Sequence, residues 1–369
     1  MLSKFRIMDI LIDVGAFESL IGIASEENYR FREKSVYSDS NNPIIKKSIM
    51  QGALAKINFD RFYGNAAMRF KNVLNVQNFM KEKDYTSYSK LIGKKIQELP
   101  IKLEETGLVL VVSNHYSIND KQNLQNTLFQ TLKVPRIAFL PHTASILTEL
   151  EINTGEIIDI GYYSTRIESI YKSFPNVDSQ FIFPLGGYHV TQHLLNSIFS
   201  RLEYKSDLPL LWETERIKKE ALFVVENPEK YSDQIHKGFK NFDYTVELPD
   251  GNEIIINYER FEPAEIFFNP LLAHTKSENL IELIEKSIKS WERDQLRDLC
   301  SNIIITGNGG NIPGLNQKIE KLLKNRFAES VDVKTPKILE QKEIFWKGAS
   351  KFIKSKKELN WISNHSKEI

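Results

Sequence analysis

The chain has 369 residues, of which 41% are hydrophobic and 26% charged, as is typical of a soluble globular protein with room for two domains. Its 49 basic and 48 acidic side chains nearly cancel, which gives no support for nucleic acid or an anionic membrane as a partner. The single cysteine excludes an internal disulfide. No uncharged run approaches the ~20 residues of a membrane span, and acidic residues interrupt the first apolar run, so we expect a cytoplasmic protein without a signal peptide.

The first predicted element is a β-hairpin over residues 5–24. Its apolar first strand contains Asp13 and turns at Gly15, which supplies the backbone freedom that a tight turn needs. The same pattern returns much later, where an apolar run reaches Asp159, turns at Gly161 and continues into an alternating segment. A repeat over so long a distance indicates two related lobes rather than a short-period array.

Between the two hairpins the pattern predicts alternating helices and strands. Residues 26–58 are polar and contain a loop signal at 38–43. The elements expected after them are a helix over 85–98, a buried strand over 108–112, a helix capped by Asn119 or Asp120, and a strand over 137–140. Pro141 and His142 then open a helix that runs through Leu150.

The second half of the chain carries further candidate site residues. A helical segment holds Lys219 and Glu220, and Asp250-Gly251 between two alternating segments predicts a hairpin. A helix is expected over 278–291. The predicted strand over 303–305 leads into a loop over 306–314 that contains Gly307, Gly309 and Gly310, and such a loop lets backbone approach a ligand closely.

These motifs, in this order, resemble the actin family over nearly the whole chain. The resemblance implies an α/β fold, an actin-like ATPase fold of two lobes, each with a mixed sheet and helices, around a central nucleotide cleft. The first lobe would comprise 1–148 and 342–369, with a reduced outer subdomain near 26–58. The second would comprise 149–341, with an outer subdomain near 185–276. Residues 345–350 and 361–363 resemble the closing helices of actin. Five short motifs between Val134 and Tyr162, and residues 184–187, are most similar to the actin-related proteins at the pointed end of dynactin.

The resemblance also implies where a nucleotide would bind. Asp13 and Gly15 match the first phosphate turn, and Asp159 and Gly161 match the second. Lys219 and Glu220 match the pair that flanks the base. The matches to the adenosine loop are Gly307, Gly309 and Gly310.

Several positions depart from what ATP hydrolysis needs in this family. Leu20 stands where a lysine reaches the phosphates, and Phe17 fills the position of a second glycine. Tyr162 and Tyr163 replace the acid and glycine of the second turn. His142 replaces the glutamine that orients water, and we expect it to bond locally at a helix start rather than to act as a base. The chain is therefore expected not to be an enzyme, with ATP or ADP either bound structurally or absent. His189 and His193 are interpreted as a polar pair without a metal.

The function implied by the resemblance is that of a non-catalytic subunit capping the pointed end of dynactin's actin-like filament, in dynein-driven transport on microtubules. Its partners would be actin, other actin-related proteins and other pointed-end subunits, in the cytoplasm and cytoskeleton. A nuclear actin-related subunit of a chromatin-remodelling complex is the alternative, and a self-polymerising ATPase is a third possibility. The residues expected to line a partner groove are Tyr171, Phe174, Trp346 and Phe352.

Overall fold

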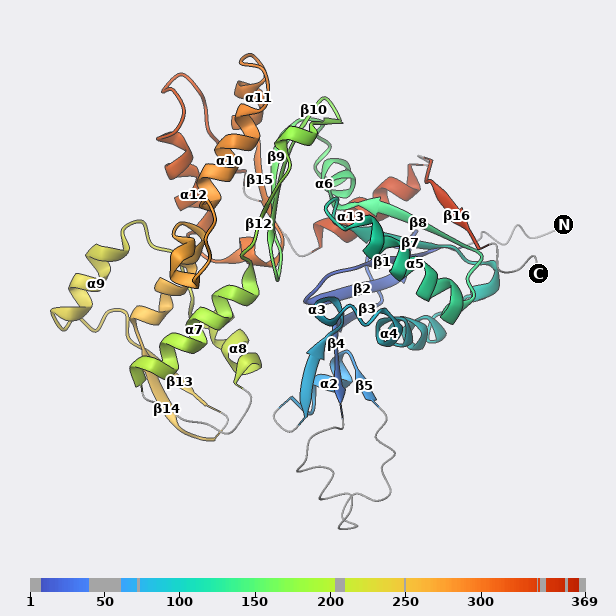
Figure 1. Ribbon diagram of the computed structural model, residues 1–369, viewed down its shortest axis with the longest axis horizontal. Helices are drawn as coiled ribbons and strands as arrows, with labels where there is room; N and C mark the ends of the chain where they lie inside the picture. The colour runs from blue at the N-terminus through green and yellow to red at the C-terminus, as the bar shows by residue number, and fades with distance from the viewer. Residues whose placement is uncertain are drawn as a thin grey trace, which may run out of the picture. The chain divides into compact units, whose positions relative to one another are not determined.

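The structure is a computed structural model that describes residues 8–39, 61–71, 74–202, 210–248, 250–336, 338, 343–355 and 358–364. The chain forms two compact units. Unit 1 comprises Met1–Ile152 and Glu343–Ile369, and unit 2 comprises Asn153–Lys342. Each contains mixed sheets flanked by helices, which confirms the predicted α/β fold class (Figure 1).

Unit 1 is built on a six-stranded mixed sheet in the order β16-β8-β7-β1-β2-β3. The predicted first hairpin is present, because β1 and β2 pair antiparallel with Asp13 opposite Leu20. Strands β7 and β8 run parallel to β1, and the side chains of β7 are buried, as expected for a parallel strand covered on both faces. The strand bounds are β1 Ile10–Asp13, β2 Glu18–Ile23, β3 Phe31–Lys34, β7 Leu108–Val112, β8 Arg136–Pro141 and β16 Trp361–Ser363.

Two pairs of helices cover the faces of this sheet (Figure 1). Helices α4 (Tyr85–Gln97) and α5 (Ile118–Leu132) pack on the face that carries Ile10 and Ile12. Helices α6 (His142–Leu150) and α13 (Ile344–Lys354) pack against each other on the opposite face, where Trp346 of α13 lies against Gly22 of β2. That second face also carries Asp13, so it is the face on which a site at the first turn would be built.

A smaller sheet completes unit 1, in the order β5-β4-β6. Its strands and the short helices beside it are β4 Val36–Asp39, β5 Arg61–Tyr63, β6 Asn75–Asn78, α2 Asn65–Met68 and α3 Phe79–Glu82. Most of the segment in which a reduced outer subdomain is predicted, namely 40–58, lies outside the described residues.

Two local predictions for unit 1 are wrong. Helix α5 is capped by Ser117, whose Oγ accepts a hydrogen bond from the backbone N–H of Asp120 at 3.0 Å, so the helix starts before Asn119. Residues 361–363 form strand β16 instead of a helix, because they pair with the open edge of β8. The guanidinium of Arg136 lies 4.2 Å from the ring centroid of Trp361 and holds this edge strand in place.

Unit 2 contains a second mixed sheet, in which β11, β10, β9 and β15 are neighbours and β12 also pairs with β10. Strands β9 and β10 form the second predicted hairpin, with Asp159 opposite Arg166. Helices α10 and α11 pack on this sheet (Figure 1). The strand bounds are β9 Gly155–Ile160, β10 Thr165–Tyr171, β11 Phe174–Pro175, β12 Phe181–Phe183 and β15 Ile303–Thr306.

The other described elements of unit 2 are helices, 3₁₀ turns and a separate hairpin, which forms at the predicted Asp250-Gly251 turn. A capping box at Asn279 and Glu282 starts α10 close to the predicted position. These elements are α7 Gly187–Leu202, α8 Leu211–Ala221, α9 Pro228–His236, β13 Tyr244–Glu247, β14 Glu253–Ile256, α10 Leu280–Lys289, α11 Leu296–Cys300 and α12 Leu315–Lys324. Throughout the described ranges, no helix combines the length and the apolar character needed to cross a membrane.

Candidate functional site

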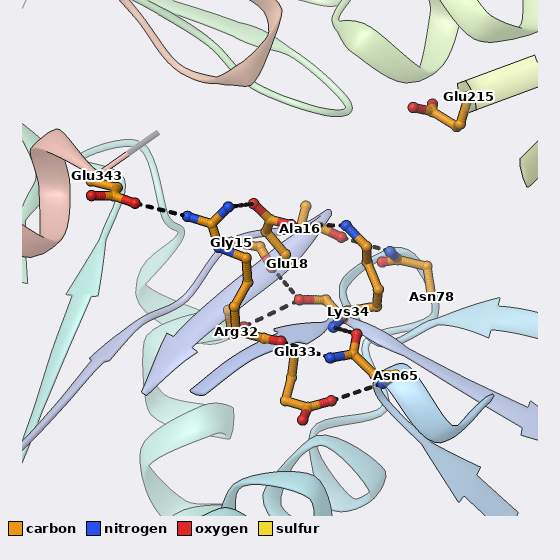
Figure 2. Close-up of polar contacts among 12 residues, drawn as sticks. Gly15, Ala16, Glu18, Arg32, Glu33, Lys34, Asn65, Asn78, Glu215 and Glu343 are labelled. Atoms are coloured by element: carbon orange, nitrogen blue, oxygen red, sulfur yellow. Dashed lines mark hydrogen bonds and ion pairs between the residues drawn. The ribbon is translucent and has the colours of Figure 1, made fainter. Parts of the chain in front are cut away.

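The first candidate turn joins β1 to β2. Two side chains from outside this hairpin, Ser35 after β3 and Asn78 at the end of β6, form hydrogen bonds to it. Ser35 Oγ donates to the carbonyl oxygen of Gly15 at 2.5 Å, and Asn78 Nδ2 donates to that of Ala16 at 2.6 Å (Figure 2). A Cβ atom on Gly15 would clash with the carbonyl oxygen of Glu18, so the turn can close only with glycine there. The turn is therefore rigid, and its carbonyl oxygens are already satisfied.

Asp13 ends β1 beside this turn and faces the start of α6. His142 is the first residue of α6, and its Nε2 lies 3.5 Å from Asp13 Oδ1. The His142 ring stacks on Phe345 of α13 with centroids 4.0 Å apart and an interplanar angle of 17°. The side chains of His142 and Asp13 are largely buried. The His142 ring therefore lies between Asp13 and Phe345, and its bonding at the helix start stays a prediction.

Leu20 supplies no charge to this face. Its side chain is 2% exposed and lies between the cross-strand neighbours Asp13 and Arg32. Cations do lie close to the turn, but they come from β3, where Lys34 Nζ sits 3.9 Å from the ring centroid of Phe17.

The second candidate turn, in unit 2, follows Asp159 and lies against the start of α7. Gly161 N donates to the carbonyl oxygen of Ser164 at 3.0 Å, while Gly187 N donates to the carbonyl oxygen of Gly161 at 2.9 Å. Tyr188 N donates to the carbonyl oxygen of Tyr162 at 2.7 Å. The N–H groups at the start of α7, which in other proteins can hold an anion, are thus bonded to the turn itself.

Aromatic rings fill the space above these bonds. Tyr162, Tyr163 and Tyr188 form a cluster whose ring centroids are 4.8, 5.2 and 5.7 Å apart. Burial, together with the nearby Glu215 carboxylate, raises the pKa of the Tyr162 phenol, so this hydroxyl stays protonated. The two tyrosines after Gly161 therefore cover this turn with packed aromatic rings.

A buried ion pair underlies the aromatic cluster. Lys218 Nζ lies 2.9 Å from a Glu215 oxygen and donates to the carbonyl oxygen of Gly187 at 2.9 Å and to Thr191 Oγ1 at 2.8 Å. Burial lowers the pKa of Lys218, whereas Glu215 opposes that shift. The lysine's hydrogen bonds are all directed inward, so it contributes to packing between α7 and α8 rather than to an open anion site.

Asp159 is enclosed by a cation on one side and by the glycine-rich loop on the other. Arg166 Nη1 lies 3.6 Å from Asp159 Oδ2 across the hairpin. Gly307 has φ of 81°, and a Cβ atom there would lie 2.6 Å from Asp159 Oδ1. Glycine is therefore required at 307 both for its backbone conformation and for the close approach to Asp159.

The structure brings several of the predicted nucleotide-binding residues together within unit 2. Asp159, Gly161, Gly307 and Gly309 cluster at one end of the unit 2 sheet, with the glycine loop folded into a 3₁₀ turn over Asn308–Asn311 that includes Gly310 and packs on Ile160. Lys219 and Glu220 are exposed on α8, and Glu220 pairs with Arg216 at 2.7 Å. Asp13 and Gly15 belong to unit 1.

Sequence reasoning missed the charged partners at both turns. Arg166 could have been found, because a hairpin closed at Gly161 and Ser164 places it opposite Asp159. Lys34 and Arg32 depend on the register between β2 and β3, for which the sequence carries no turn signal. Glu215 and Lys218 depend on the packing of two helices, which local patterns do not specify.

The four predicted groove residues have different environments. Phe174 is 73% exposed, Tyr171 packs against Trp291 with centroids 5.8 Å apart, and Phe352 is partly buried. Trp346 was expected on a groove surface, but its side chain is 0% exposed because it faces inward from α13 onto β2. Trp346 is therefore a core residue of unit 1.

The two histidines of α7 each have a separate partner within unit 2. His193 Nε2 lies 2.5 Å from Glu262 Oε1, and His189 Nδ1 accepts a hydrogen bond from Gly186 N at 3.2 Å. Burial lowers the pKa of His189, which keeps its ring neutral. Within the described part of the chain, histidine, cysteine and acidic side chains form no group of three or more that could hold a metal ion.

Comparison with known proteins covers almost the entire chain. The model of the family described as Actin matches residues 6–207 and 213–365. The chain is also similar to "Putative actin-29" of Dictyostelium discoideum, with 24% identity over 339 residues that cover 88% of this chain and 84% of that protein.

Proposed function

The chain belongs to the actin family, and from this premise we propose that it is a non-catalytic actin-related subunit that caps the pointed end of dynactin's actin-like filament. The observation that carries the non-catalytic part is that apolar or aromatic side chains lie at or beside both turns. In unit 2, Tyr162 and Tyr163 pack over the turn after Asp159. In unit 1, the apolar Leu20 is buried where hydrolysis needs a cation.

The remaining polar groups cannot easily support in-line hydrolysis. That reaction needs an oriented water and positive charge around the phosphoryl group. His142 is stacked on Phe345 beside Asp13, and Asp159 faces the guanidinium of Arg166. Each group that could take part therefore already has a protein partner.

The predicted nucleotide-binding residues fit the base and ribose of a nucleotide better than its phosphates. The glycine loop at 307–310 and the exposed Lys219 and Glu220 suit contacts to a base and ribose. The two turns suit the phosphates less well, because Leu20 brings no charge to the first turn and the N–H groups of Gly161, Gly187 and Tyr188 bond within the second. ATP or ADP, if held, would be a structural ligand of unit 2.

An exposed apolar edge of unit 2 supports the filament-end role. Phe174, Val177 and Ile182 are 73%, 79% and 54% exposed on three short neighbouring segments, β11, the 3₁₀ turn Val177–Ser179 and β12. Grouped exposed apolar side chains of this kind mark protein interfaces. The choice of dynactin as the assembly, and so of dynein-driven transport in the cytoplasm, rests on the sequence resemblance of the motifs between Val134 and Tyr162 and of 184–187. A subunit of a chromatin-remodelling complex is the alternative.

Copurification separates these two assemblies. The full chain, tagged and expressed at native level, is expected to bring down the filament and pointed-end subunits of dynactin. Recovery of remodelling-complex subunits instead would replace the dynactin proposal by its alternative and leave the non-catalytic proposal standing.

End binding should depend on Phe174. We expect the full chain to bind one end of preformed filaments of its partner actin-related protein, and Phe174→Asp to weaken this by at least about tenfold, because a charge cannot be buried unpaired at an interface. Imaging labelled protein on filaments measures the effect. Ile255→Asp is the matched control, since Ile255 is 51% exposed on the separate β13–β14 hairpin. Labelling along filament sides, or equal losses in both variants, would contradict the assignment of this edge.

A further inference from the structure

Four charged side chains form a chain of ion pairs beside the first turn of unit 1 (Figure 2). Lys34 Nζ lies 2.8 Å from Glu18 Oε2, and Arg32 Nη1 lies 3.9 Å from Glu18 Oε1. The other end of the same guanidinium, Nη2, donates to Glu343 Oε1 at 3.2 Å. Glu18 is the most buried of the four, with its side chain 13% exposed. One carboxylate is thus shared by two cations next to the turn.

Strand register places this group on one face of the sheet. Glu18 is opposite Lys34, and Leu20 is opposite both Arg32 and Asp13. Because alternate residues of a strand share a face, the two cations of β3 point to the side on which Leu20 and Asp13 lie. Glu33, between them in β3, points to the other face, where it pairs with Lys95 at 3.2 Å.

The two cations come from a different strand than Leu20 but supply positive charge to the same face. Arg32 presents a planar fork and Lys34 a compact ammonium, which together match the geometry of a phosphate group. Lys347 also lies 3.9 Å from Glu343, so the group holds three positive and two negative charges. Neutralising Glu18 would leave the partly buried Lys34 without its carboxylate partner.

We infer that Glu18 is a built-in anion that masks a latent phosphate-binding pair, Arg32 and Lys34. A tethered carboxylate acts at high effective concentration, so a phosphate ester from solution would have to displace it and break two ion pairs. This inference rests on the proposed non-catalytic function and names the residue that keeps phosphates out of unit 1.

The test is binding of pyrophosphate and of ATP, each without divalent cations, to the purified full chain by calorimetry. The wild-type chain should show no saturable pyrophosphate binding at millimolar concentration. Glu18→Gln should bind it at least about tenfold more tightly, the equivalent of one charge-assisted hydrogen bond. Adding Lys34→Gln to that variant should remove the gain. Glu33→Gln, which breaks an ion pair on the other face of the same sheet, should gain nothing.

Two outcomes would overturn the inference. One is a Glu18→Gln variant that binds pyrophosphate no better than wild type, and the other is a gain that survives Lys34→Gln. If Glu18→Gln does not fold, Glu18→Asp keeps the charge but withdraws it from Lys34, and a gain of about threefold is expected. No gain in that variant would be equally decisive. Pyrophosphate binding is independent of ATP turnover by the wild-type chain, so failure here is distinct from failure of the proposed function.

Discussion

Replacing Gly348 by alanine should destabilise unit 1 by roughly 3 kcal/mol or more, although alanine inside a helix normally adds about 1 kcal/mol of stability over glycine. Gly348 lies on α13 where this helix crosses α6, and a Cβ atom there would overlap the backbone carbonyl oxygen of Ser145. Backbone cannot move aside as a side-chain end can, so the two helices would have to separate.

Urea unfolding of the full chain measures the effect, and Gly93→Ala is the matched control. Gly93 lies inside α4, and its added Cβ would meet only the end of the Leu132 side chain, at 2.9 Å. That variant should change stability by no more than about 1 kcal/mol. His142 starts α6 and Glu343 directly precedes α13. If Gly348→Ala is as stable as wild type, the close packing of these two helices does not determine the positions of His142 and Glu343.

The stability of unit 2 should fall as pH rises, because of a carboxyl group in its core. Glu156 on β9 is 0% exposed, and Ser287 Oγ donates to it at 3.1 Å. Burial raises the pKa of Glu156 to about 8, and the Glu168 carboxylate adds to the rise. The folded state therefore keeps a proton that the unfolded chain releases above its ordinary pKa of about 4.3.

The sign of this effect follows from proton binding. Because the pKa of Glu156 is raised in the folded state, the stability that Glu156 contributes is fully present below about pH 4.3. It is lost progressively as the pH rises to about 8. The loss attributable to Glu156 amounts to roughly 5 kcal/mol at about 1.4 kcal/mol per pKa unit.

Glu156→Gln isolates this contribution. Other groups also titrate over this range, but their effects cancel in the difference between the variant and wild type. We expect the free energies of unfolding of the two proteins to diverge between pH 5, 6.5 and 8. With each rise in pH, the glutamine variant should become more stable relative to wild type. A difference that stays constant with pH would show that Glu156 ionises at its ordinary pKa in the folded state.

Local patterns were enough to predict the parts of the fold on which the site depends. The turns at Gly15 and Gly161, the strand over 108–112 and the glycine loop at 307–310 all form as expected. Each is specified by residues adjacent in sequence, namely an apolar run and the glycine that ends it. The positions of the two aspartates at their strand ends follow from the same signal.

What could not be predicted depends on contacts between distant segments. Residues 361–363 became a strand because the edge of β8 was open to them, which no local propensity records. Trp346 was expected on a surface, whereas the rotation of α13 places it in the core. The ion pair of Glu18 with Lys34 needs the β2–β3 register, and the Glu215–Lys218 pair needs α7 beside α8. The charged partners of the turns were therefore found only in the structure.

The most direct test of the non-catalytic proposal is phosphate release from ATP and Mg²⁺ by the purified full chain, followed over hours. Leu20, the stacked His142 and the packed Tyr162 and Tyr163 predict no release above that of a heat-denatured sample. Steady release at the rate of an ordinary actin would contradict the account, because it would require both turns to open to the phosphates.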